Sequence, residues 1–172
     1  MSTEAKRERS EQVMNMLGLD HVADTIVGNE VLRGLSGGQV KRLSIGVEII
    51  NFPDLMFLDE PTTGLDSSVS FDVMSAVRNL ANQNRTVICT IHQPSNETGA
   101  LFDTLLLMAS GKVIYFGPCA DATHYFVTSP YQFYYHPGSN PFDFAIAVAG
   151  AFLPDATGKH ITGLELADYY SG

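Results

Sequence analysis

Two short segments carry the residue types that a site for a phosphate-bearing ligand needs. The first, Ser36-Gly37-Gly38-Gln39, opens an amphipathic stretch. At the start of a helix it would offer a hydroxyl, unobstructed backbone N–H groups and the positive end of a helix dipole to an anionic oxygen. The second, Asp59-Glu60, directly follows the apolar residues 55–58. Together the two segments predict half of a nucleotide-hydrolysing site.

Asp59 and Glu60 end a predicted apolar strand, and open α/β sheets place their ligands at the carboxyl ends of strands. Adjacent side chains of a strand point to opposite sides, so we expect the two carboxylates to have different roles. Asp59 would hold Mg²⁺, through water, and Glu60 would orient or deprotonate the attacking water. Because Pro61 follows, a pair of acids that begins a surface turn remains an alternative.

His92 follows the next predicted strand, residues 86–91, which puts it at the same edge of the sheet as Glu60. That position suits a hydrogen bond to a terminal phosphate. Each feature also has a purely structural interpretation: an ordinary helix cap for Ser36, a solvated side chain for Gln39, a structural role for a lone histidine. The joint arrangement favours the functional interpretation, since three independent coincidences would have to occur in the correct order.

The elements that must position these groups are predicted from the spacing of apolar residues. A helix begins at Gly37 with Ser36 as its cap, and its apolar residues are Val40, Leu43, Val47 and Ile50. Residues 55–58 are short enough for a fully buried parallel strand. A second helix starts near Asp66, and its apolar face consists of Val69, Val73, Ala76, Val77 and Leu80. Residues 86–91 form a buried strand, so the order strand, helix, strand predicts a parallel βαβ crossover.

The flanking regions are predicted to be regular in part. A helix over residues 3–17 is followed by a short helix that begins at Asp20, and residues 27–34 are loop-like. Residues 104–108 and 113–116 form a hairpin, and a helix covers residues 141–150. No element is predicted in the aromatic stretch between them or in the tail.

Composition limits the class of protein. The 172 residues, 45% of them hydrophobic, suffice for one globular core. The net charge of −9 disfavours sequence-independent binding to nucleic acid, because that binding relies on positive charge. The two cysteines, Cys89 and Cys119, suggest neither a disulfide framework nor a metal site, which fits a reducing, cytosolic setting. The start lacks the apolar core of a signal peptide, and the longest apolar run, residues 144–153, falls well short of the roughly 20 residues of a membrane-spanning helix.

Four motifs in order resemble those of ABC-type ATPases. Residues 35–39 resemble the signature motif, 55–60 the Walker B strand, 63–66 the D-loop, and His92 the switch histidine. The sequence around these motifs resembles more specifically the G subfamily of ABC transporters. The segments that carry this resemblance are 34–46, 59–67, 91–95 and 115–118. Residues 140–144 are similar to the segment that closes the nucleotide-binding domain in that group. The resemblance covers nearly the whole chain.

The resemblance implies an α/β fold class: part of a P-loop NTPase (ABC ATPase) fold, with parallel strands, flanking helices and a terminal hairpin. It also implies three segments. Residues 1–34 would end the helical subdomain, 35–136 would carry the signature, Walker B, D-loop and switch histidine, and 137–172 would form a C-terminal helix and a linker towards a membrane domain. The expected setting is the cytosolic face of a membrane.

The family mechanism implies a head-to-tail dimer of nucleotide-binding domains under the transmembrane domain of the same transporter, with ATP and Mg²⁺ as cofactors. Residues 36–39 would face the ATP held by the partner domain, while Asp59, Glu60 and His92 would serve the ATP of their own domain. Asp66 would bridge the two halves. Val40 stands where a basic residue is usual, which weakens the local positive field.

The 172 residues contain no Gly-x-x-x-x-Gly-Lys-Ser/Thr loop, which in this family lies upstream of the signature. We therefore expect the C-terminal portion of the nucleotide-binding domain of an ATP-driven exporter. Two alternatives remain open. A soluble ABC ATPase acting on chromosomes or ribosomes would need a basic face or long heptad arms, and neither is visible. A non-catalytic fragment would pair with a complete domain through residues 36–39.

The purified 172-residue chain should hydrolyse no ATP by itself. Phosphoryl transfer needs Mg²⁺, cationic groups and N–H donors arranged around the moving phosphate, and the lysine loop that supplies several of these is not in the sequence. Phosphate release from Mg-ATP should equal that of a Glu60→Gln chain. Appreciable release that the substitution abolishes would show that the chain completes a site without that loop.

Overall fold

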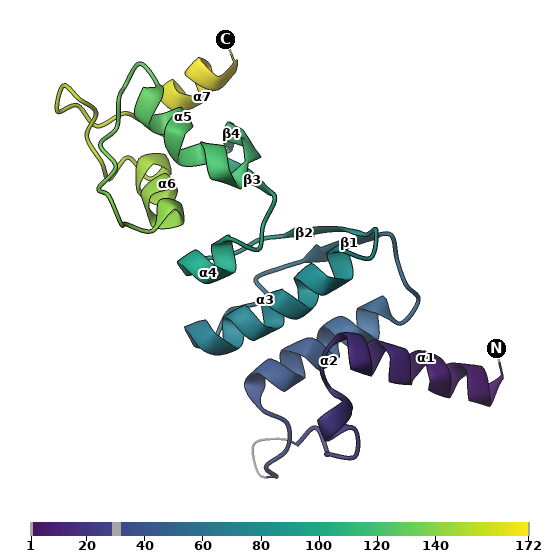
Figure 1. Ribbon diagram of the computed structural model, residues 1–172. Helices are drawn as coiled ribbons and strands as arrows, with labels where there is room; N and C mark the ends of the chain where they lie inside the picture. Colours follow the sequence, from purple (N-terminus) through teal and green to yellow (C-terminus); the bar gives the residue numbers. More distant parts are fainter. Residues whose placement is uncertain (1, 29–31, 172) are drawn as a thin grey trace. The chain divides into compact units, whose positions relative to one another are not determined.

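A computed structural model describes residues 2–28 and 32–171 of the chain (Figure 1). Part of the stretch 27–34, predicted to be a loop, lies outside the described residues. The chain divides into two compact units, Met1–His92 and Gln93–Gly172. The predicted chemistry-bearing residues, from Ser36 to His92, all belong to the first.

The first unit is built around one parallel pair of strands. Its elements in order are α1 (Thr3–Met16), the 3₁₀ turn η1 (Asp20–Val22), α2 (Gly37–Ile49), β1 (Leu55–Leu58), α3 (Ser67–Ala81) and β2 (Thr86–Cys89). β1 pairs with β2 in parallel, from Leu55 opposite Thr86 to Leu58 opposite Cys89. The predicted βαβ crossover through α3 is therefore confirmed.

The helices of this unit lie in successive layers on the sheet. In Figure 1, α3 runs along one face of the β1–β2 pair, α2 lies beside α3, and α1 lies beside α2. The core of this unit is apolar, and its largest members are Val13, Leu17, Leu19, Ile45, Ile49, Met56, Val73, Met74, Val77 and Leu80. The predicted apolar face of α3 is confirmed, apart from Val69, which is only half-buried while Met74 is buried.

The predicted burial of both strands on two faces is wrong. Burial alternates along each strand: Met56 is 5% exposed, whereas Phe57 is 72% and Ile88 51% exposed. The apolar run could not reveal this, because α3 covers one face of the pair and the side chains that alternate to the other face, Leu55 included, remain exposed.

The predicted apolar face of α2 is also displaced. Its buried residues are Gly38, Ile45, Gly46 and Ile49, and Val47 is 63% exposed. A Cβ at Gly46 would lie 3.0 Å from Leu17 Cδ1, so the helix touches α1 through a residue without a side chain. A helix face that is predicted from the positions of large apolar residues cannot include this contact, because glycine has no side chain.

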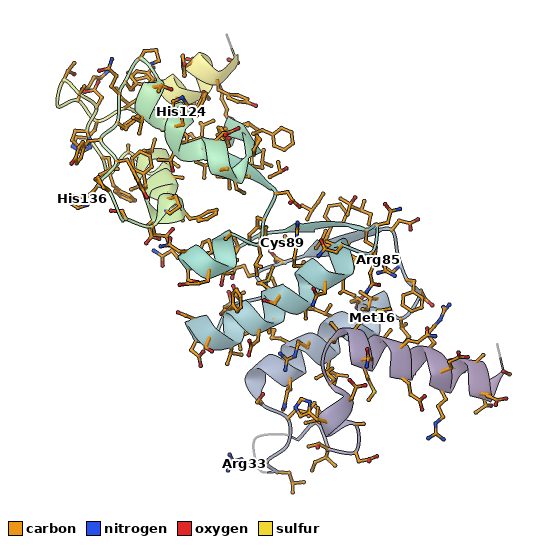
Figure 2. All side chains as sticks on the ribbon, viewed as in Figure 1. Met16, Arg33, Arg85, Cys89, His124 and His136 are labelled. Carbon is orange, nitrogen blue, oxygen red and sulfur yellow. The ribbon has the colours of Figure 1, made fainter. Side chains whose placement is uncertain are left out.

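Phe52 contacts two arginine side chains through its ring. Its backbone has φ 52°, and the guanidinium groups of Arg9 and Arg85 lie 4.8 and 5.3 Å from its ring centre. Arg85, labelled in Figure 2, directly precedes β2. These cation–π contacts tie α1 to the connection that leads into β1.

The second unit packs helices around a hairpin. It contains α4 (Asn96–Gly99), β3 (Thr104–Ala109), β4 (Lys112–Pro118), the 3₁₀ turn η2 (Cys119–Asp121), α5 (Ala122–Thr128), α6 (Pro141–Ala149) and α7 (Gly163–Ser171). The hairpin and α6 were predicted and are confirmed, whereas α4, α5 and α7 were not predicted. The largest side chains of the core are Tyr115, Ile114, Phe126, Phe133, Phe144, Ile161 and Leu166. Among the described residues, no helix combines the length and apolar character that crossing a membrane requires.

Candidate functional site

Ser36 and Gln39 cap the start of α2 reciprocally. Ser36 Oγ accepts a hydrogen bond from the backbone N of Gln39 at 3.3 Å, and Gln39 Oε1 accepts one from the backbone N of Ser36 at 2.8 Å. This capping box satisfies two of the backbone donors that the start of a helix leaves unpaired. The predicted helix start is confirmed, and both predicted binding side chains have a structural role there.

His21, which was not predicted to be near the site, lies beside the same turn. Its Nε2 is 3.4 Å from the side-chain nitrogen Nε2 of Gln39. The amide can donate to this ring atom only when the imidazole carries its proton on Nδ1. Nothing in the sequence pattern indicated the contact.

The glycines of the turn bring α2 against the start of α3 and the residues just before it. A Cβ at Gly38 would lie 2.3 Å from Val69 Cγ1 in the first turn of α3, and one at Gly37 would lie 3.4 Å from Leu65 Cδ2. Gly38 is buried and Gly37 exposed. The missing side chain of Gly38 therefore serves helix packing, independently of any ligand.

Asp66 caps α3, as predicted. Its Oδ1 accepts a hydrogen bond from the backbone N of Val69 at 2.9 Å. The Val69 side chain in turn meets Gly38, so the start of α3 connects this cap with the start of α2. Asp66 and residues 36–38 thus lie at one side of the unit, held by the α2–α3 contact.

Asp59 and Glu60 are joined through the hydroxyl of Thr90 (the end of β2 is marked by the Cys89 label in Figure 2). Thr90 Oγ1 donates to Asp59 Oδ1 at 2.6 Å and accepts from the backbone N of Glu60 at 2.9 Å. On the other side, Thr63 Oγ1 donates to Glu60 Oε2 at 2.8 Å. Both acidic residues are exposed to solvent.

Glu60 has a left-handed backbone, with φ 44°. Non-glycine residues seldom adopt this conformation, which recurs at functional sites where the surroundings hold the strain. Here the surroundings are the Thr90 hydroxyl on its N–H and a turn in which the N of Thr63 donates to its carbonyl at 3.2 Å. The conformation turns the chain away from the strand directly after Asp59.

His92 lies two residues beyond Thr90 and is exposed. The structure thus brings Asp59, Glu60 and Thr90 into direct contact and carries His92 on the segment that supplies Thr90. Sequence reasoning missed Thr90 and Thr63. The register could have found Thr90, since a parallel pair that aligns Leu58 with Cys89 places residue 90 beside residue 59.

The carboxylates fit a magnesium ion held mainly by other ligands. Over the described residues, no group of three or more histidine, cysteine, aspartate or glutamate side chains is placed to hold a metal. Mg²⁺ does not need one, since it usually keeps several waters and takes one or two carboxylates plus substrate phosphates. An exposed carboxylate at a strand end, with one oxygen already oriented by a hydroxyl, is a suitable partner for such a hydrated ion.

Comparisons with known proteins show the family of this chain. A protein-family model described as ABC transporter matches residues 1–63. The broad substrate specificity ATP-binding cassette transporter ABCG2 of Rattus norvegicus is 47% identical over 148 residues, which are 86% of this chain and 22% of the rat protein. ABC transporter G family member 13 of Arabidopsis thaliana is 49% identical over 116 residues, 67% of this chain and 17% of that protein. The chain belongs to the ABC transporter family. It spans about a fifth of the length of these ABC transporter relatives.

Solved ABC cassettes share the fold. The ADP conformation of MJ1267, an ATP-binding cassette of an ABC transporter, superposes with a TM-score of 0.59 at 23% identity, over 76% of this chain and 49% of that one. A nucleotide-free ATP-binding cassette gives a TM-score of 0.58 at 26% identity, over 68% and 44% of the two chains. The predicted fold class, part of a P-loop NTPase fold, is confirmed. The roles of individual site residues and the boundaries of the three predicted segments stay predictions.

Replacement of Gly38 by alanine should destabilise the 172-residue chain by about 1–3 kcal/mol, because the new methyl group would overlap the stiff, β-branched side chain of Val69. Urea unfolding followed by circular dichroism measures the change. Gly37→Ala is the matched control: its methyl group would only reach ordinary contact with Leu65, so stability should stay equal or rise slightly. Equal stability of the two variants would contradict a packing role for Gly38.

Proposed function

We propose that this chain is part of the nucleotide-binding domain of an ATP-driven exporter of the ABC transporter G family, in which ATP binding and hydrolysis drive substrate movement across a membrane. The observation that carries the proposal is the constellation at the end of β1, where the hydroxyl of Thr90, the residue after β2, donates to the carboxylate of Asp59 and accepts from the backbone N of Glu60. The G-family relatives and the order of the four motifs support it.

The carboxylate pair divides the work of hydrolysis. Glu60 is the general base that orients or deprotonates the attacking water, and Thr63 fixes one of its oxygens. Asp59 holds Mg²⁺ through water, and the ion would neutralise charge on the phosphates of bound ATP. His92 donates a hydrogen bond to the terminal phosphate.

The turn before α2 serves the ATP of a second nucleotide-binding domain. The capping box uses the N–H groups of Ser36 and Gln39. The N–H groups of Gly37 and Gly38, in the first turn of the helix, have no intrahelical acceptor. These donors, the Ser36 hydroxyl and the helix dipole suit the terminal phosphate of a nucleotide presented by the partner domain. Gln39 and Asp66 complete this surface, and Asp66 bridges the two halves of the dimer.

The assembly is then a head-to-tail pair of nucleotide-binding domains on the cytosolic face of a membrane, attached to the transmembrane domain of the same transporter. Its segments are 1–34 at the end of the helical subdomain, 35–136 with the nucleotide-contacting motifs, and 137–172 leading towards the membrane domain. The net charge of −9 disfavours nucleic acid as a partner.

Glu60→Gln in the full-length transporter should lower ATP turnover by about 10² to 10⁴-fold, because glutamine keeps the shape of the side chain but cannot accept the proton of water. Binding of a fluorescent ATP analogue should change little. Glu48→Gln is a matched control, since Glu48 is exposed on α2 and should leave turnover unchanged. Full turnover in the Glu60→Gln transporter would overturn the assignment of the general base.

A further inference from the structure

Thr90 occupies a fixed position beside the carboxylate pair. Its backbone N donates to the carbonyl of Leu58 at 3.0 Å, which extends the parallel ladder by one bond beyond Cys89. The residue is exposed to solvent and is not part of the buried core. Its side chain therefore matters through the hydroxyl, and the ladder sets where that hydroxyl lies.

One oxygen atom serves both acidic residues. A threonine hydroxyl has a single proton and two lone pairs. The proton goes to Asp59 Oδ1, at a distance of 2.6 Å that is typical of a hydrogen bond to a charged acceptor, and a lone pair receives the N–H of Glu60. The side chain of Asp59 and the backbone of Glu60 are thus attached to the same atom of a neighbouring strand.

Glu60 is held from two sides. Thr63 contacts its carboxylate from three residues away along the chain, within the same turn, whereas Thr90 contacts its backbone from another strand. The Thr90 contact ties the left-handed backbone of Glu60 to the segment that continues β2. Without it, the turn of residues 60–63 would lose its side-chain anchor on the residue that follows β2.

We propose that Thr90 is a positioning residue, whose hydroxyl locks the metal-holding carboxylate of Asp59 and the backbone of the base Glu60 into one fixed arrangement. This inference rests on the proposed function of the same site. Nucleophile and metal must keep a defined geometry for in-line attack on a phosphate, and small displacements there are costly in rate. Thr90 acts through its two neighbours and needs no contact with the nucleotide.

Valine and serine separate the two properties of the side chain. Thr90→Val keeps the β-branched shape and removes the hydroxyl, whereas Thr90→Ser keeps the hydroxyl. In the full-length transporter, kcat for ATP hydrolysis should fall about tenfold to a hundredfold in Thr90→Val and should stay within about threefold of wild type in Thr90→Ser. KM for ATP should change little in both. The Mg²⁺ concentration for half-maximal turnover should rise in Thr90→Val alone.

A direct readout comes from hydrogen–deuterium exchange of the peptide 57–63 in the same protein without nucleotide. The N–H of Glu60 loses its acceptor in Thr90→Val, so the peptide should exchange faster, and serine should restore the wild-type rate. Thr86→Val is the matched control, because Thr86 is an exposed threonine at the opposite end of the same strand. It should alter neither exchange nor turnover, which also controls for loss of strand stability.

The outcomes separate this inference from the proposed function. Wild-type kcat and exchange in Thr90→Val, with turnover abolished by Glu60→Gln, would overturn the role of Thr90 alone. An equal loss in the valine and serine variants would overturn it too, because serine retains the hydroxyl. If Glu60→Gln in the full-length transporter left ATP turnover unchanged, the proposed function would be refuted instead. Faster exchange in Thr90→Val that Thr90→Ser reverses would still support the positioning contact.

Discussion

Parallel pairing of β1 with β2 governs the position of every chemical group at the carboxyl ends of these strands. The ladder aligns Leu58 with Cys89 and continues through the N–H of Thr90, so the next residue of each strand emerges at the same level. Asp59 and Thr90 meet for this reason, although they are far apart in the sequence. A shift of one residue in the register would turn the Thr90 side chain to the other face and separate the two groups.

The helices add a second constraint, at the start of α2. The capping box fixes the entry of the chain into this helix, and the bare face of Gly38 lets Val69 of α3 approach closely. Since Asp66 caps α3 one turn earlier, the two polar helix starts are parts of a single packed junction. Residues proposed to face a partner domain are thereby built on the core of the unit and not on a free loop.

Much of this arrangement could be predicted from the sequence. The spacing of Val73, Val77 and Leu80 and the cap at Asp66 predicted α3, and the two apolar runs predicted the parallel strands. The strand faces and the buried side of α2 could not be predicted, because the sequence does not say which face a neighbour covers. The short helices α5 and α7 escaped notice because their aromatic-rich segments lack a long repeat. Thr90 was missed because the search for chemical groups considered carboxylates and histidine. The neutral hydroxyl of Thr90 becomes important only through the register that places it beside Asp59.

The uncovered face of the β1–β2 pair has a consequence for the behaviour of the chain in solution. Leu55, Phe57 and Ile88 present an exposed apolar surface on the sheet. In the described part of the chain this sheet consists of β1 and β2, so its outer edges can also pair with another strand. Mutual repulsion between chains of net charge −9 opposes this attraction. The balance between the two makes colloidal stability depend on ionic strength: salt that screens the charge leaves the apolar attraction in place and favours aggregation.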